Sequence, residues 1–215
     1  MSLGRRRDSE SLGKLGWDFR IGKFVLEDRV FANGAWESQQ QNVENDKFRG
    51  LFDLATLETG WIAFLKGEGL NAKLVRVGQD YGNQPTDKHS EGFRVIVKLD
   101  ASLGGTVREF ISTFRAAWAA MSQLHDDYLA GIGKHPDCLP AVDIAGVHEE
   151  PTRNKEPLLV PQYKIAGWQP RPFDLPASGI PLIRRAKKAG ASADQTNGGD
   201  THPTVEDDFK DSIPF

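Results

Sequence analysis

A chain of 215 residues with 39% hydrophobic residues is long enough for one sizeable folded domain with appendages. Its one cysteine, Cys138, excludes an intramolecular disulfide framework and fits a reducing, cytoplasmic environment. The sequence contains no run of about 18 apolar residues and therefore predicts no membrane span. The early arginines are not followed by the apolar stretch of a secretory signal. With a net charge of −3, binding to nucleic acid would need a local basic patch rather than a global field.

The first part of the chain contains one apolar segment between polar ones. Residues 1–16 are rich in Arg, Ser and Gly, and we expect them to be flexible. The apolar run at residues 23–31 predicts a strand that ends at the turn signal Asn33-Gly34. The polar stretch at residues 37–46, with three consecutive glutamines, is typical of a loop.

Four further segments predict strands. They are aromatic-rich or alternate between polar and apolar residues, and turn residues separate them. They cover residues 48–57, 61–65, 72–77 and 93–99. The last alternates most clearly, so that Arg94 and Lys98 share the face opposite Phe93 and Val95.

One long helix is predicted at residues 107–129. Thr106 and Glu109 have the spacing of a capping box, and Gly131 with Gly133 supplies a stop. Apolar residues recur at helical spacing and predict one buried stripe, which places Phe110, Phe114 and Trp118 in the core. The stripe comprises Val107, Phe110, Ile111, Phe114, Trp118, Met121 and Tyr128.

Two strands, at residues 141–147 and 158–168, follow the helix, and from about residue 186 the composition predicts a disordered linker. The fold class is therefore mainly β with one long helix. Strands, a helix and two more strands match the β-β-β-α-β-β order of the OB fold, a Greek-key barrel that binds oligonucleotides. We expect a flexible N-terminus (1–16), an OB-like nucleic-acid-binding domain (17–185), a disordered linker (186–206) and an acidic tip (207–215).

Aromatic and basic residues interleave between residues 61 and 98 and again near residue 168. Binding of single strands requires flat rings for base stacking and cations for phosphates, which this pattern supplies. For Trp61 the alternative to base stacking is a position in the core. For Trp168 the sequence favours base stacking and closure of the barrel end equally. The predicted nucleic-acid-binding residues are Trp61, Lys73, Arg76, Tyr81, Arg94, Lys98, Trp168 and Arg171.

The sequence predicts neither a cofactor nor a catalytic centre. His135 and Cys138 have a ligand-like spacing, but no second close pair completes a zinc motif. There is no Gly-x-Ser-x-Gly elbow, and Gly104-Gly105-Thr106 lacks the Walker-A lysine pattern. We interpret the adjacent acids, such as Asp126-Asp127, as solvated.

The last nine residues are acidic and end on Ile-Pro-Phe. A tip of this kind is suited to a basic pocket on another protein, to which it presents a ring, a rigid proline and a carboxylate. It resembles the C-terminal tail of bacterial and phage single-stranded DNA-binding proteins, from which Lys210 and Ser212 depart by interrupting the acids. The matching residues, which are the predicted partner-binding residues, are Asp207, Asp208, Asp211, Ile213, Pro214 and Phe215.

The resemblance implies a protein of phage or phage-like origin that acts in DNA replication, recombination or repair. It implies that the protein coats single-stranded DNA, recruits enzymes of DNA metabolism through its tip, catalyses no reaction and forms a homo-oligomer. Two alternatives stay open: a nuclease with a recruiting tail, and an interaction protein that mimics the tail of a host single-stranded DNA-binding protein.

Charge is distributed unevenly along the sequence. Residues 1–188 contain 26 basic and 24 acidic residues, and they end in the basic cluster 184–188. This leads to the hypothesis that the acidic tail folds back onto a basic surface and competes with DNA. The tail, residues 189–215, contains one basic residue, Lys210, and six acidic ones: Asp194, Asp200, Glu206, Asp207, Asp208 and Asp211.

Overall fold

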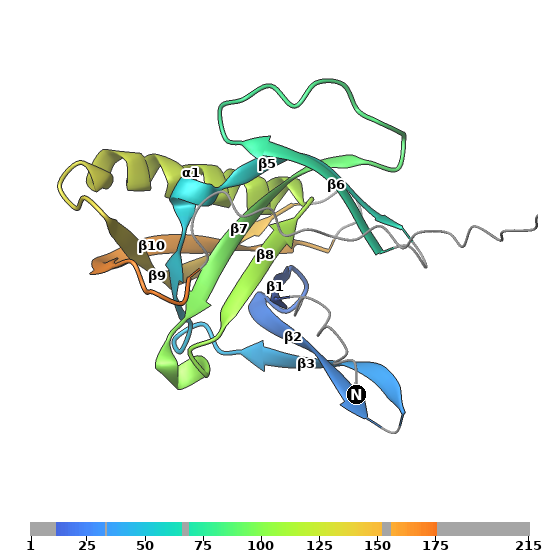
Figure 1. Cartoon of the computed structure of the whole chain (residues 1–215), viewed down its shortest axis with the longest axis horizontal. Helices are drawn as coiled ribbons and strands as arrows, with labels where there is room; N and C mark the ends of the chain where they lie inside the picture. Colours follow the sequence, from blue (N-terminus) through green and yellow to red (C-terminus); the bar gives the residue numbers. More distant parts are fainter. Residues whose placement is uncertain (1–11, 33, 66–68, 152–155, 176–215) are drawn as a thin grey trace, which may run out of the picture. The chain divides into compact units, whose positions relative to one another are not determined.

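The computed structural model describes residues 12–32, 34–65, 69–151 and 156–175, all in the first of two units into which the chain divides. This part is mainly β, with one α-helix, α1 (Arg115–Ile132), and two short 3₁₀ turns, η1 (Leu54–Thr56) and η2 (Ala101–Leu103), as Figure 1 shows. The expectation of a mainly β protein with one helix is confirmed. The strands are β1 (Gly13–Asp18), β2 (Lys23–Ala32), β3 (Ala35–Val43), β4 (Arg49–Phe52), β5 (Glu58–Leu65), β6 (Gly69–Arg76), β7 (Ser90–Leu99), β8 (Val107–Ser112), β9 (Cys138–Glu150) and β10 (Leu158–Pro170).

Strand β7 is the centre of the sheet. It pairs with β8 along one side, and with β4 and then β5 along the other, because η1 divides one long segment into two strands. From β4 the sheet continues to β9 and β10, from β5 to β6, and from β8 through β1 and β2 to β3. The β1–β8 pair is parallel. Within the described ranges this path does not close on itself.

Aromatic rings fill the core between the sheet and α1. The Phe24 ring has no exposed surface and stacks on Phe48 at a centroid distance of 3.9 Å. Trp17 and Phe110 pack against it in T-shaped arrangements, with centroid distances of 5.1 and 5.5 Å. Met121, on α1, is also buried in this cluster. Rings packed edge-on gain stabilisation beyond the apolar area they bury, so β1, β2 and β8 are held to one core.

The prediction of a helix from residue 107 is wrong at its start. Residues 107–112 form β8, in which Phe110 lies opposite Val95 of β7, and α1 begins at Arg115. Thr106 does not cap a helix: its hydroxyl accepts a hydrogen bond from Arg108 Nε at 3.1 Å. Both faces of β8 are covered, because Arg108 and Glu109 are buried by ion pairs, and the strand therefore shows no polar–apolar alternation. Phe114 is not a core residue but is 40% exposed.

Two other segments differ from expectation. Residues 37–46 were predicted as a loop, but most of them belong to β3, which pairs with β2 over nine consecutive residues. Side chains from Glu37 to Asn42 are exposed on both faces, so burial imposes no alternation there. Residues 13–16, expected to be flexible, lie in β1 between β2 and β8. Within the described residues, no helix has the length and apolar character needed to cross a membrane.

Candidate nucleic-acid interface

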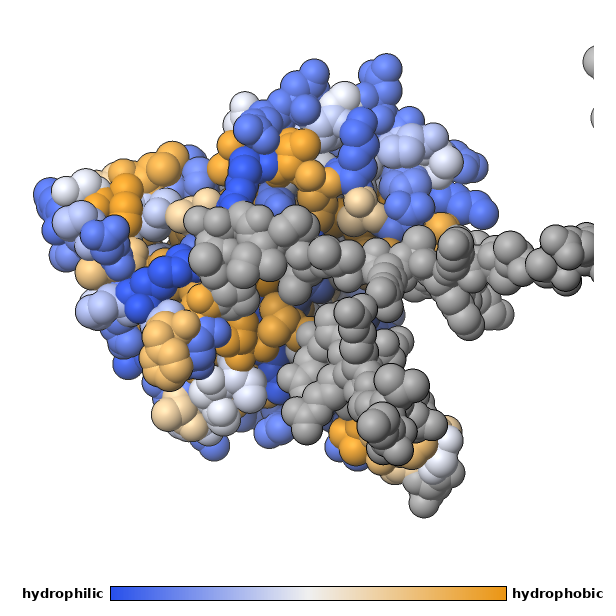
Figure 2. Space-filling view, in the orientation of Figure 1, coloured by the Kyte–Doolittle hydropathy of each residue, from blue (hydrophilic) through white to orange (hydrophobic). Residues whose placement is uncertain are grey.

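Trp61, Lys73 and Tyr81 gather at one end of the sheet. Trp61 on β5 lies directly opposite Lys73 on β6 and Glu91 on β7, so the three side chains share a face. The Trp61 indole donates to the Gly82 carbonyl at 2.9 Å, and its ring meets Tyr81 edge-on at 5.7 Å. In the space-filling view, hydrophilic side chains cover the neighbouring 77–89 loop at the top (Figure 2). The two rings are therefore fixed beside a polar surface.

A hydrogen bond and the contact with Trp61 hold the Tyr81 ring in place, while Lys73 stays accessible. The Tyr81 hydroxyl donates to Glu91 at 2.8 Å, and this bond, together with burial and the nearby charge, raises the pKa of Tyr81. Lys73 is exposed and makes no ion pair within the described residues. A phosphate can therefore reach Lys73 without displacing a carboxylate.

Arg76 and Arg94 lie in a row of alternating charges across the sheet. Glu58 on β5 is opposite Arg76 on one side and Arg94 on the other. Arg94 Nε donates to Glu58 at 2.6 Å, and Glu109 lies 3.5 Å from its guanidinium. Arg76 donates to the Ala55 carbonyl at 3.0 Å. Since two carboxylates flank Arg94, a phosphate would have to compete with them for this cation.

Two ion pairs hold residues 171–175, which follow β10 and which we term the strap. Lys98 forms an ion pair with Asp174, and Arg171 donates to Asp53 at 2.6 Å. The Asp53 carboxylate is 1% exposed, and the hydrogen bond with it, assisted by its charge, raises the pKa of Arg171 against an opposing burial effect. The strap is thus tied to β7 and to the turn after β4.

The strap presents an aromatic ring that the sequence analysis missed. Phe173 is 102% exposed, although Arg171 and Asp174 are held by ion pairs and Leu175 is buried. A free ring between fixed neighbours is suited to stacking on a base. The signal was present in the sequence, because Phe173 lies two residues after the predicted contact Arg171, but it lies beyond the last predicted strand, 158–168.

Trp168, near the end of β10, packs against α1 and the turn that follows it. Its ring stacks on His135 at 4.8 Å and approaches Tyr128 of α1 at 5.9 Å. A Cβ placed on Gly131 would lie 2.5 Å from the indole, so the ring packs against the end of the helix. Of the two roles considered for Trp168, this geometry favours closing the end of the core.

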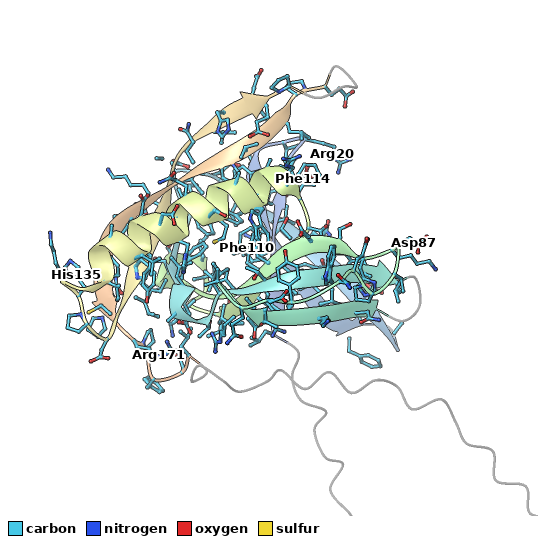
Figure 3. All side chains as sticks on the ribbon, turned by 90° about the horizontal axis from the view of Figure 1, so that it is seen from above. Arg20, Asp87, Phe110, Phe114, His135 and Arg171 are labelled. Atoms are coloured by element: carbon cyan, nitrogen blue, oxygen red, sulfur yellow. The ribbon has the colours of Figure 1, made fainter. Side chains whose placement is uncertain are left out.

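The predicted residues span the length of the sheet. Figure 3 shows Arg171 at one end and Asp87, in the loop beside Tyr81, at the other. Arg94 and Lys98 lie between them on one face of β7, because their positions differ by an even number of residues. From Glu91 to Lys98 the strand extends about 23 Å. This length suits an extended chain rather than a compact ligand. The predicted tip and linker, 186–215, lie outside the described residues.

A cavity of about 160 Å³ lies between α1 and the sheet. Its lining includes Thr59, Phe93, Trp118 and His125. Burial lowers the pKa of His125, against a smaller opposing effect of Asp126. No three metal-ligating side chains cluster in the part of the chain that the structure describes.

Comparisons with known protein families, with curated proteins and with solved structures found no match for this chain.

Proposed function

We propose that the protein binds single-stranded DNA through an OB-type domain. The observation that carries the proposal is the order of strand pairing. Taking β4 and β5 together as the first strand, it pairs with the second, β7, and with the fourth, β9. The second pairs with the third, β8, and the fourth with the fifth, β10, while α1 follows the third. This pairing agrees with the strand order expected of a partly open Greek-key barrel, to which β6 and the N-terminal strands β1 to β3 would be additions.

Strand β1 supports the barrel interpretation by lying between β8 and β10. It pairs with β8, and beyond its other end the Leu159 amide donates to the Phe19 carbonyl at 2.8 Å. The Trp17 indole in turn donates to the Leu159 carbonyl at 2.7 Å. An N-terminal strand therefore bridges the gap between the third and fifth strands.

The positions of the candidate residues agree with this assignment. OB domains bind oligonucleotides on the face of their second and third strands and with the loop between the first and second. Arg94 and Lys98 lie on β7, and Trp61, Lys73 and Tyr81 lie in and around the β5–β6 hairpin that joins the first strand to the second. In this chain the connection between the first and second strands of the proposed OB domain therefore carries the rings, and the second strand, β7, carries two of the cations.

The electrostatics indicate that stacking contributes more than phosphate contacts. Arg94, Lys98 and Arg171 are each paired with at least one carboxylate, so a bound phosphate would replace an existing ion pair. The number of counterions released on binding sets the slope of log affinity against log salt, close to one per phosphate contact. We expect a shallow slope, with Lys73 as its main contributor.

The acidic tip completes the proposal. We assign residues 207–215 the recruitment of DNA-metabolism enzymes with a basic pocket, on the strength of the resemblance of Asp207, Asp208, Asp211 and Ile213-Pro214-Phe215 to that family's tail.

The test is a titration of the intact protein with labelled oligo-dT, followed by anisotropy and by tryptophan fluorescence at several salt concentrations. Saturable binding, weakened by Lys73→Ala but not by Lys47→Ala, supports the proposal, since both remove one exposed lysine. Absence of binding in both signals would refute it and leave the tail mimic. Cleavage of the strand with Mg²⁺ or Mn²⁺ would instead identify a nuclease.

A further inference from the structure

Three strands form edges of the described sheet: β3, β6 and β10. Each pairs along its length with one neighbour, namely β2, β5 and β9 respectively. An edge strand offers a row of backbone donors and acceptors to any other strand, and proteins usually block it with lysine, proline or a bulge.

Two of these edges carry such blocks. β6 has Lys73 and Arg76 within its eight residues. β10 has Pro161 near its start and Pro170 at its end, and its pairing with β9 shifts register twice. Neither edge accepts another strand readily.

The edge at β3 carries none of them. Its sequence, Ala-Trp-Glu-Ser-Gln-Gln-Gln-Asn-Val, contains no lysine, arginine or proline, and its nine pairs with β2 run without a register shift. Glu37 is its sole charged residue, and side chains from Glu37 to Asn42 are exposed. β3 therefore has no bulge, no charge at its centre and none of the features that usually prevent another strand from pairing.

The outer half of this hairpin is also a two-stranded ribbon. β1 pairs with β2 no further than Glu27, so residues 28–32 pair with β3 alone among the described residues. Figure 1 shows the hairpin projecting from the rest of the sheet. Two-stranded ribbons are marginally stable in water, and further strands stabilise them.

We propose that β3 pairs with β3 of a second copy of this chain, in antiparallel orientation, to form a four-stranded ribbon across a two-fold axis. The side chains make the edge self-complementary, because Gln39, Gln40 and Gln41 each offer both donors and acceptors to one another. With a single acid, like charges meet only if the axis passes through Glu37. An axis at Gln39, between Ser38 and Gln40, places Gln39 opposite its own copy and Ser38 opposite Gln40. Amide side chains then face an amide or a hydroxyl.

The first test is sedimentation equilibrium of the full chain. We expect a dimer, and we expect Gln39→Lys with Gln40→Lys to raise its dissociation constant at least about tenfold, because lysines then face each other across the axis. The control is Asn71→Lys with Ala72→Lys, which adds the same charge at two exposed, adjacent positions of another edge strand, β6. It should leave the dimer intact.

The second test locates the axis. In a Cys138→Ala background, Gln39→Cys should form an intermolecular disulfide under mild oxidation, since an axis at this residue places the two cysteines directly opposite each other, with Cα atoms within the range of about 4.4–6.8 Å that a disulfide needs. Gln123→Cys, exposed on α1, should not. A monomeric wild-type chain at every accessible concentration would overturn the proposal. So would a dimer that tolerates the β3 lysines, because its interface would lie elsewhere.

Discussion

At the scale of single residues, charged side chains in this protein serve packing as much as binding. Asp53 illustrates this, because its carboxylate is 1% exposed and its Oδ1 atom is buried without a hydrogen-bond partner. Its other oxygen accepts from Arg171 at 2.6 Å. A buried carboxylate that loses its cation is costly, so Arg171, predicted from the sequence as a DNA contact, also anchors the strap.

We expect Arg171→Ala to lower the free energy of unfolding by about 2–3 kcal/mol, because Asp53 then remains buried and unpaired. Urea denaturation measures this loss. Arg20→Ala is the control, since Arg20 pairs with Asp18 at the surface, where solvent screening leaves such a pair little effect on stability. Equal losses in the two variants would show that the Asp53 pair is no more important than a surface one.

Phe173 leads to the opposite kind of prediction. Because its side chain is fully exposed, Phe173→Ala should leave the urea midpoint unchanged. If the proposed function is correct, the same change should weaken oligo-dT binding by about 1–3 kcal/mol, the value of one stacked base. Phe64→Ala, at a ring that is 61% exposed on β5, is the control for nonspecific loss of apolar surface. Equal affinity of Phe173→Ala and wild type would remove the strap from the interface.

At the scale of elements, α1 is fixed to β10 through Trp168. Gly131 leaves room for the indole, and a Cβ there would lie 2.5 Å from it. Gly→Ala within a helix normally stabilises by up to about 1 kcal/mol. Here we expect Gly131→Ala to destabilise by about 1–3 kcal/mol through overpacking. Gly133→Ala is the matched control, since it meets no atom within 4 Å and has φ −60°. Thermal unfolding of both variants measures the difference. A Gly131→Ala variant as stable as the wild type would show that the indole can move away from the helix.

The helix also makes stability depend on pH through His125. Because burial lowers its pKa, the folded state binds a proton less readily than the unfolded state does. Stability should therefore fall as pH drops below the ordinary value of 6.5, where the unfolded chain takes up the proton first. We expect the urea midpoint to fall between about pH 7.5 and about pH 5.5, and His125→Gln to reduce that fall. An unchanged pH dependence in the variant would exclude His125 as its source.

The elements also show which parts of the fold the sequence could predict. Strands with one buried face, such as β7, were predicted correctly because Phe93, Val95 and Val97 are buried and alternate with a less buried face that carries Arg94 and Lys98. β3 was missed because neither face is buried, and β8 was taken for helix because both faces are. Pattern reasoning depends on a difference between faces, and these two strands lack it.

The sequence predicted only part of the candidate site, because it shows residue types but not the contacts between distant strands. Composition identified Trp61, Lys73 and Tyr81, which lie together, because rings and cations are visible in the sequence. It did not reveal that Glu58, Glu109 and Asp174 pair with Arg94 and Lys98, since these contacts join distant strands and the strap. Ion pairing across the sheet therefore changes the expected binding mode from phosphate contacts toward stacking.

At the scale of the whole molecule, charge divides the chain into a nearly neutral body and an acidic tail. Residues 189–215 contain six acids and one base, whereas residues 1–188 are slightly basic. In the body, carboxylates already pair with several cations of the candidate interface. A tail that competes for the same surface would therefore act mainly on the cations that stay accessible, of which Lys73 is the clearest.

Truncation after Lys188 should then strengthen oligo-dT binding several-fold at about 50 mM salt, where charges are weakly screened, with the difference fading as salt rises. Anisotropy of the labelled strand measures both chains. Replacing Asp207, Asp208 and Asp211 by Asn keeps the length of the chain and should give part of the gain in affinity.

Phe215→Ala keeps the charge of the tail, so it should leave the binding of single strands unchanged while abolishing the capture of partner proteins. Equal affinities of truncated and full chains at low salt would show that the tail does not compete, and the tip would then act on partner proteins alone.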